Sequence, residues 1–329
     1  MRTNAIFVVF FVVGISHLIS YSQNDFLKTE KNKYSDNYYL NLGILAAENK
    51  KSDSAIYYIS KSIELNNKNP ITYYVRATVL YELNRYDEAI ADLNQSIKIN
   101  PNDEKALYLR AIINQNRLDF INAIKDYEKL IKMNPKDTNY RFQYAYCLQE
   151  INEFQKSIDA YLNYEKLVTK PSQEFFINVA YNYVKLKQYS EALKYILKSE
   201  KQGYNISELV ELKINILISQ QNCEQAIKIF EDNKNSLENQ SILLTNIGSC
   251  YLKIKEYNKA IQALAKAYEI DNSLVENLFY LAYIQQQLGN RKATQSYLEQ
   301  FVDQSKNRDD LINLREDAIK QLEFIKKNK

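Results

Sequence analysis

The chain has 329 residues, of which 46% are hydrophobic and 25% charged, with a formal net charge of +3. This composition is typical of a folded protein, and the charge balance argues against a nucleic-acid binder. Only 5 glycines and 4 prolines are present, whereas β-sandwiches and barrels need these residues at many tight turns. One histidine, three cysteines and no glycine-rich loop argue against metal sites, histidine catalysis and nucleotide binding. We therefore expect a helical protein that is not an enzyme and uses no cofactor and no metal.

The N-terminal residues are typical of an export signal. Arg2 precedes an apolar run over residues 5–15, and small residues follow at Ser20 and Ser22. The run is shorter than the roughly 20 apolar residues that a membrane-spanning helix needs. We interpret 1–22 as a cleaved signal peptide, with an uncleaved membrane anchor as the alternative, and 23–35 as a flexible segment. The expected location is outside the cytoplasm: exported, and periplasmic, secreted or associated with the cell envelope.

Alanine residues recur along the rest of the chain with a period of 34. Ala89 and Ala123 are one period apart, and Ala192, Ala226 and Ala260 continue the series. An aromatic residue stands three places before several of these alanines. This pattern resembles the tetratricopeptide repeat (TPR), a helix–turn–helix unit in which small residues allow close helix packing.

The resemblance implies an all-α fold, a right-handed α-solenoid of about eight helix–turn–helix units with a C-terminal capping helix at 309–329. One extra residue, Ser172, falls between the fourth and fifth units. The least regular unit is 207–240, which has Ile214 at a place for a small residue, so we expect a bend or mobile seam there. The repeats are 36–69, 70–103, 104–137, 138–171, 173–206, 207–240, 241–274 and 275–308.

Aromatic residues recur on the first helices of the repeats. The resemblance implies that places 2, 5, 9, 12 and 13 of each first helix face a concave groove. Tyrosine offers a large contact area at a low entropic cost, so these rings form a candidate binding stripe. The alternative is that the rings only pack between neighbouring inner helices. The candidate groove residues are Tyr74, Tyr81, Tyr108, Phe142, Tyr146, Tyr181, Phe279 and Tyr283.

Two arginines occupy the same place in adjacent repeats. Arg76 and Arg110 are matched by Asp92 and Asp126 in the second helices of the same repeats. We interpret them as structural arginine–carboxylate pairs between helices rather than as ligand-binding residues.

The three cysteines form no recognisable disulfide framework. We therefore interpret Cys147, Cys223 and Cys250 as buried, unreactive thiols. Cys147 and Cys250 lie three repeats apart, which is too far for a bridge. Cys223 and Cys250 are the one pair in which a bridge is worth seeking.

By resemblance, the expected function is that of an exported, non-catalytic scaffold that binds a protein or peptide partner in its concave groove, in envelope assembly or secretion. One alternative is a structural subunit that self-associates within a larger envelope complex. Another is a glycan-binding module, which the absence of tryptophan disfavours. We expect no nucleic acid or metal as a partner, and membrane contact only by association or through an uncleaved N-terminal segment.

Overall fold

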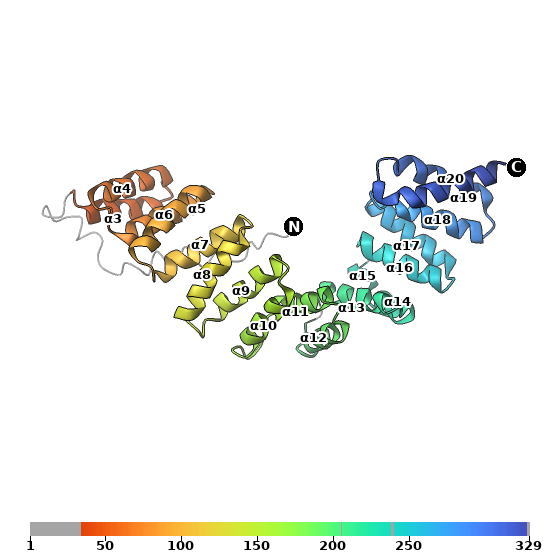
Figure 1. Cartoon of the computed structure of the whole chain (residues 1–329), viewed down its shortest axis with the longest axis horizontal. Helices are drawn as coiled ribbons and strands as arrows, with labels where there is room; N and C mark the ends of the chain where they lie inside the picture. Colours follow the sequence, from red (N-terminus) through yellow and green to blue (C-terminus); the bar gives the residue numbers. More distant parts are fainter. Residues whose placement is uncertain (1–33, 205, 238–239, 328–329) are drawn as a thin grey trace. The chain divides into compact units, whose positions relative to one another are not determined.

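The computed structural model describes residues 34–204, 206–237 and 240–327. The expected signal peptide at 1–22 and residues 23–33 of the expected flexible segment lie outside this range. Within the described residues the regular structure is entirely helical, and successive helices pack as hairpins (Figure 1). The chain divides into two compact units between Leu167 and Val168, and each unit is described by itself.

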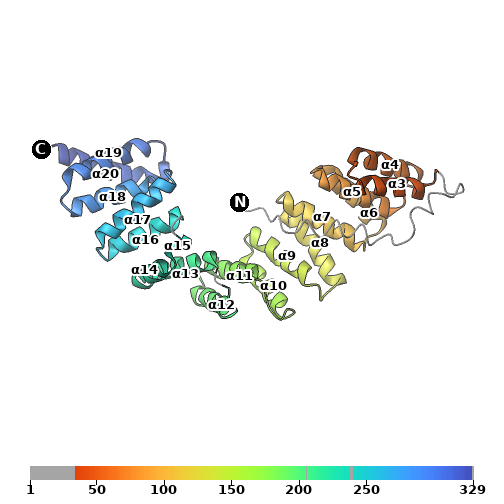
Figure 2. The ribbon, with the colours of Figure 1, turned by 180° about the vertical axis from the view of Figure 1, so that it is seen from behind.

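Unit 1 contains four helix pairs. The two helices of each pair contact each other extensively, and consecutive pairs stack side by side in both ribbon views (Figures 1 and 2). The helices are α3 (Asp36–Glu48), α4 (Ser52–Leu65), α5 (Pro70–Glu82), α6 (Tyr86–Ile99), α7 (Glu104–Asn116), α8 (Phe120–Met133), α9 (Thr138–Glu150) and α10 (Phe154–Glu165).

Unit 2 contains four further pairs and a closing segment. The pair that is sixth along the whole chain is irregular, because its second helix ends at Asp232 and a four-residue helix follows. The elements are α11 (Gln173–Lys185), α12 (Tyr189–Lys201), α13 (Ser207–Ser219), α14 (Cys223–Asp232), α15 (Lys234–Leu237), α16 (Ser241–Lys253), α17 (Tyr257–Ile270), α18 (Glu276–Gln287), α19 (Arg291–Gln304), the 3₁₀ helix η3 (Asp309–Leu311) and α20 (Ile312–Lys327).

Side-chain caps set where many of the first helices begin. In α7, the Asp103 carboxylate accepts hydrogen bonds from the backbone N–H groups of Lys105 and Ala106, at 3.1 and 3.2 Å. Such a cap satisfies N–H groups that have no partner within the helix. The caps recur at intervals of 34 residues, and of 35 where the extra residue falls: Ser35, Asn69, Asp103, Asp137 and Ser172.

Every helix pair turns through a residue with a left-handed backbone. These residues have φ between 57° and 72° and are Lys50, Asn84, Leu118, Asn152, Lys187, Gln221, Lys255 and Gly289. The following N–H donates to the carbonyl five residues before it, as from Lys51 to Ala46 at 2.9 Å. This hydrogen bond is part of the Schellman arrangement, which usually places glycine at the left-handed position. Because seven of the eight residues are not glycine, the sequence analysis did not detect the motif.

Small residues lie where the helices pack most closely. Ala77 and Ala111 in first helices, and Ala89 and Ala123 in second helices, are completely buried. Gly248 shows how tight these contacts are, since an added Cβ atom would lie 2.7 Å from the Leu264 side chain. The period of small residues therefore reflects the closeness of the two helices in each pair.

The last two elements cover the apolar end of unit 2, as expected of a capping helix. Leu311, Ala318, Leu322 and Ile325 are buried in one cluster with Val275, Leu278, Ala282, Leu298 and Phe301. The Arg291 side chain also donates to the backbone carbonyl of Ile325. This helix removes apolar surface from water that the last helix pair would otherwise expose.

The boundary between the compact units lies at Leu167 and Val168, just before the extra residue Ser172. The irregular pair at 207–240 belongs to the interior of unit 2, where Ile214 is fully buried and Phe230 and Leu237 join the same core. The bend or mobile seam expected there stays a prediction.

Candidate functional site

The candidate site is the face of each unit formed by the first helices of the pairs, here called the inner face. In unit 1 these helices are α3, α5, α7 and α9, and in unit 2 they are α11, α13, α16 and α18. First helices of neighbouring pairs contact one another, as α5 does α7 and α13 does α16. Side chains at equivalent places therefore lie beside one another within a unit.

The eight candidate residues differ in exposure: some are buried, some half-buried and some exposed. Five lie in unit 1, where Tyr74 is buried and the other four are half-buried. Three lie in unit 2, where Phe279 is half-buried. Tyr181 and Tyr283 are the most exposed, at 37% and 46% of their surface. The residues are Tyr74, Tyr81, Tyr108, Phe142 and Tyr146 in unit 1, and Tyr181, Phe279 and Tyr283 in unit 2.

Tyr108 is held in place by three neighbours. Its ring packs edge-on against Tyr127, with centroids 6.3 Å apart, and at 5.2 Å against Tyr140. The amide of Asn139, on the next inner helix, donates a hydrogen bond to the Tyr108 hydroxyl at 2.6 Å. Burial raises the pKa of Tyr108, so its hydroxyl stays neutral at physiological pH. A half-buried ring fixed in this way is pre-organised for contact.

Phe142 and Tyr146 form a second aromatic group on α9. Phe142 packs edge-on against Tyr161 and Tyr164, each at 5.3 Å between centroids. Tyr146 packs against Phe120 of the preceding pair at 6.3 Å. Burial and the negative charge of the nearby Glu150 raise the pKa of Tyr146 to about 12.

The two tyrosines on α5 differ from each other. Tyr81 is half-buried, packs against Tyr86 at 5.9 Å between centroids, and accepts a hydrogen bond from the amide of Asn116 at 3.2 Å. Tyr74 is only 9% exposed and belongs to the hydrophobic core of unit 1. Tyr74 therefore contributes to packing and offers little surface to a partner.

The three candidate residues of unit 2 do not form a single group in the same way. Phe279 packs on the core residue Phe301 at 5.4 Å between centroids. Tyr181 lies on α11, in the first pair of the unit, and the ammonium group of Lys185 sits 5.0 Å from the centroid of its ring. Tyr283 lies on α18, in the last pair.

Two residues of the inner face were missed by the sequence analysis. Asn116 and Asn139 link neighbouring inner helices by donating to Tyr81 and Tyr108, respectively. Both stand at inner places of their repeats, so the 34-residue register could have found them. The pattern that could have predicted these hydrogen bonds is a tyrosine at an inner place of one repeat and an asparagine at an inner place of the next.

Family models for tetratricopeptide repeats match the chain at residues 70–103, 243–274 and 276–307. These three segments are therefore similar to tetratricopeptide repeats. No curated protein matches it.

Solved structures are also similar to this chain. The Cut9–Hcn1 hetero-tetramer of the APC/C matches with a TM-score of 0.50 and 15% identity, over 90% of this chain and 58% of the other. MamA from Desulfovibrio magneticus RS-1 matches with a TM-score of 0.46 and 16% identity, over 50% of this chain and 93% of the other. At 15% identity, the similarity to the Cut9–Hcn1 structure concerns the fold alone.

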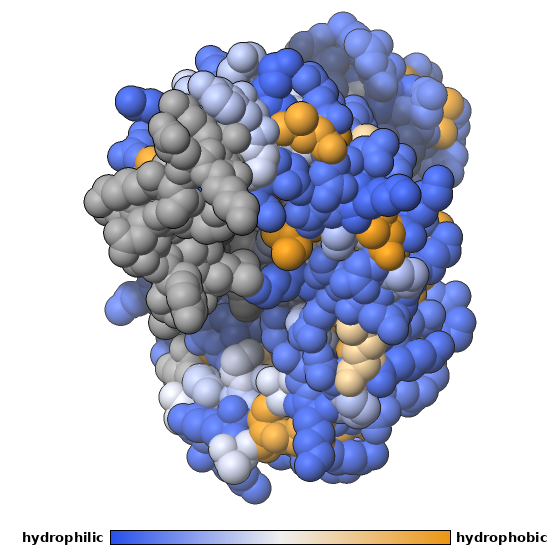
Figure 3. All heavy atoms as spheres, turned by 90° about the vertical axis from the view of Figure 1, so that its left-hand side faces the viewer, coloured by the Kyte–Doolittle hydropathy of each residue, from blue (hydrophilic) through white to orange (hydrophobic). Residues whose placement is uncertain are grey.

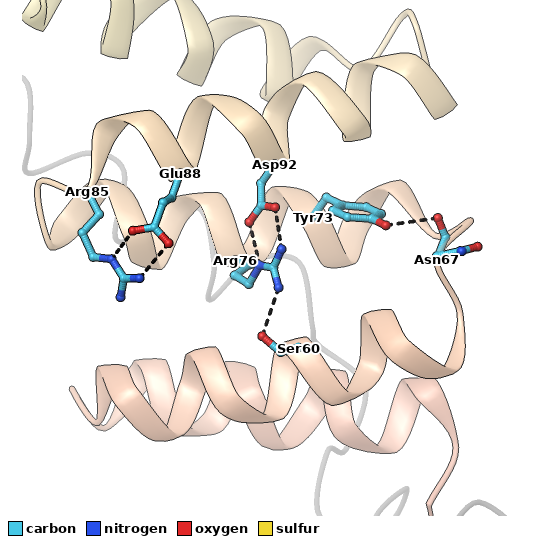
Figure 4. A network of polar contacts seen from close by, with 7 residues as sticks. All are labelled: Ser60, Asn67, Tyr73, Arg76, Arg85, Glu88 and Asp92. Atoms are coloured by element: carbon cyan, nitrogen blue, oxygen red, sulfur yellow. Dashed lines mark hydrogen bonds and ion pairs between the residues drawn. The ribbon is translucent and has the colours of Figure 1, made fainter.

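The arginine–carboxylate pairs that the sequence predicted join the two helices of a repeat. Arg76 donates from Nε and Nη2 to both carboxylate oxygens of Asp92, at 2.7 Å each, and from Nη1 to Ser60 at 3.0 Å (Figure 4). Arg110 repeats the arrangement one unit later with Asp126 and Asn94. Each arginine thus links its own helix to two others, which confirms a structural role.

The cysteines correct one expectation. Cys223 and Cys250 form a disulfide between α14 and α16, with Cα atoms 5.2 Å apart, so they are not free thiols. Cys147 alone is a buried free thiol, and burial raises its pKa to about 12. Cys223 stands where most other repeats have an aromatic residue at the start of the second helix. The disulfide replaces that aromatic contact with the next repeat.

The remaining surface offers few other sites. The face shown in Figure 3 is mainly hydrophilic, with hydrophobic residues scattered between polar ones, as is ordinary for a protein surface. In the part of the chain that the structure describes, no helix is both long and apolar enough to cross a membrane. Across those same residues, no three His, Cys, Asp or Glu side chains gather as a metal site would require.

Proposed function

We propose that this protein is an exported, non-catalytic TPR scaffold that binds a protein or peptide on its inner face, with a role in envelope assembly or secretion. The observation that carries the binding role is the set of half-buried rings on the inner helices of unit 1. Tyr81, Tyr108, Phe142 and Tyr146 each pack one side against the protein and keep part of the ring exposed. Rigid aromatic side chains of this kind contribute strongly to protein interfaces.

The hydrogen bonds on the inner face favour a binding role over packing alone. Tyr108 and Tyr81 are oriented by amides of the neighbouring helix, and their rings remain partly accessible. Fixing a side chain before binding lowers the entropic cost of complex formation. A partner that covers these rings would remove apolar surface from water without reorganising the helices.

Two features support export. The N-terminal 22 residues have the composition of a cleaved signal peptide. The disulfide between Cys223 and Cys250 is the kind of bond that persists in the periplasm or outside the cell and is rare in the cytosol. The location is tested by determining the N-terminal residue of protein isolated from its native host, which we expect at or near Gln23.

The binding role is tested by affinity capture with matched variants of the full chain. Tyr108→Ala removes the central ring of the inner face, and we expect partner affinity to fall by about 2 kcal/mol, as at an interface hot spot. Tyr57→Ala is the control, because Tyr57 lies on the outer helix α4 and is 58% exposed. Quantitative mass spectrometry should find proteins that depend on Tyr108 and not on Tyr57.

Two outcomes would contradict this proposal. If no captured protein depends on Tyr108 while circular dichroism shows the variant to be folded, the inner face of unit 1 is not the binding surface. If light scattering shows a stable oligomer that the Tyr108→Ala change dissociates, the face mediates self-association instead, as in the structural-subunit alternative.

A further inference from the structure

Three of the four inner helices of unit 1 end in a carboxylate, and the fourth, α7, ends in Asn116. Glu48, Glu82 and Glu150 are the last residues of α3, α5 and α9, and all three are exposed. The C-terminus of a helix is the negative end of its dipole, so a cation is favoured there and an anion is not. In unit 2 the equivalent place carries Lys185 in α11 and Lys253 in α16. Unit 1 therefore holds its carboxylates at an unfavourable position.

Within the described residues, no Lys or Arg forms an ion pair with Glu82 or Glu150, and Glu150 has only the neutral Tyr146 hydroxyl as a hydrogen-bond partner to offset its charge. Two arginines lie close by in the sequence, but each pairs with another residue: Arg85 with Glu88 at 2.7 Å, and Arg117 with Asp87 at 2.9 Å. Although Glu82 is exposed, desolvation by its neighbours raises the pKa of its carboxyl above the usual value.

Each of the two carboxylates has a tyrosine ring beside it in the sequence. Tyr81 directly precedes Glu82 on α5, and Tyr146 stands one helical turn before Glu150 on α9. The proximity of the second pair is also seen in the effect of the Glu150 charge on the Tyr146 hydroxyl. A cation that meets both a ring face and a carboxylate gains from both contacts.

The fifth repeat shows what such a ring can hold. In α11 the places that match Tyr146 and Glu150 carry Tyr181 and Lys185. The ammonium group of Lys185 lies 5.0 Å from the centroid of the Tyr181 ring, within the range of a cation–π contact. In that repeat the chain supplies the cation itself. In the fourth repeat a carboxylate stands at the place of the lysine, so a cation would have to come from outside the chain.

We propose that the inner face of unit 1 recognises lysine or arginine side chains of a protein partner. One basic side chain binds between the ring of Tyr146 and the carboxylate of Glu150, and a second binds at Tyr81 and Glu82. The intervening repeat is neutral at the same places, with Gln115 and Asn116, so the partner needs basic residues at two separated positions. This inference rests on the proposed function, because it assigns chemistry to the same surface.

The test uses synthetic peptides as probes and the full chain as the receptor. Fluorescein-labelled 12-residue peptides share one Ala, Ser and Ile background and carry two lysines, two serines or two glutamates at the same positions. We expect each bound lysine to strengthen binding by about 5- to 30-fold over serine, from one ion pair and one cation–π contact at its site. Fluorescence anisotropy measures the affinities, and added salt should weaken the lysine peptides most.

Charge variants connect the preference to the proposed residues. Glu150→Lys should remove the part of the lysine preference that the Tyr146 site supplies, and Glu150→Gln should reduce that part several-fold, while the site at Tyr81 and Glu82 keeps its share. Asp159→Asn is the matched control for Glu150→Gln, because it makes the same charge change at an exposed place on the outer helix α10 of the same repeat. Tyr146→Phe keeps the ring and should retain the preference.

The inference is wrong if the lysine peptides do not bind, if glutamate peptides bind equally well, or if Glu150→Lys leaves the preference unchanged. These results are distinguishable from failure of the proposed function. Partner capture that depends on Tyr108 but is unaffected by Glu150→Lys would retain the binding face and reject the basic partner. If the lysine preference depends on Glu150 while partner capture does not depend on Tyr108, the basic recognition is retained and the proposed role of Tyr108 in partner binding is rejected.

Discussion

The disulfide between Cys223 and Cys250 allows a prediction whose size can be worked out from the structure. The two residues are 27 apart in sequence and join the sixth and seventh helix pairs. Closing a loop of this length removes about 12 cal/mol/K of entropy from the unfolded chain, which is about 3.5 kcal/mol at 25 °C. We expect the Cys223→Ser, Cys250→Ser variant to lose free energy of unfolding of this order.

The loss should be confined to unit 2. Each repeat of a solenoid contacts mainly its neighbours, so a destabilised interface acts locally. Hydrogen exchange followed by mass spectrometry should show faster exchange in α13 to α17 of the variant, while α3 to α8 keep their protection. Urea denaturation with and without a reducing agent should reproduce the difference in the wild-type chain.

Thiol counting provides the control for this prediction. Cys147 is fully buried and its pKa is raised to about 12, so the native oxidised chain should react with no more than a trace of thiol reagent. Unfolding without reductant should expose one thiol, and unfolding with reductant three. Three thiols without reductant, or equal unfolding free energies for the two chains, would refute the reasoning.

Three further predictions concern the repeats themselves. Leu118 has φ of 61° and is 74% exposed, so Leu118→Gly should raise the free energy of unfolding by about 1 kcal/mol in chemical denaturation; a loss would contradict the strain assigned to it. Phe120 matches Cys223 in register and Cys147 matches Cys250, so Phe120→Cys should form a new disulfide with Cys147, visible as a mass loss of about two hydrogens; two free thiols after unfolding would contradict the equivalence. Arg110→Ala should cost about 3 kcal/mol, because it leaves a carboxylate that is only 5% exposed without its guanidinium; a cost below about 1 kcal/mol, as at an exposed ion pair, would contradict the structural role.

Much of the fold could be predicted from the sequence because its causes are local. The period of small residues reports close helix packing, and Ala77, Ala89, Ala111 and Ala123 are indeed fully buried. The all-α hairpin fold is confirmed for this reason. The arginine–aspartate pairs were predictable in the same way, since the repeat register brings matching places together.

The site was less predictable because exposure depends on neighbouring helices. Tyr74 and Tyr108 occupy the same place in consecutive repeats, yet Tyr74 is in the core and Tyr108 is half-buried. The rings of the inner face both pack and remain accessible, so the two interpretations of the stripe are not exclusive. The amides that orient them come from the next helix, and only the stacked structure shows which amide reaches which hydroxyl.

By itself, the sequence determined that the chain folds into repeated helix pairs, because periodic small residues and capping side chains act within one or two turns of helix. Only the tertiary structure decided three other features. It joined Cys223 to Cys250, because the first residue of α14 lies against α16 of the next repeat. It divided the chain at Leu167 and Val168, and it left Glu82 and Glu150 outside the ion pairs of the described residues. Each depends on contacts between repeats, which no local pattern encodes.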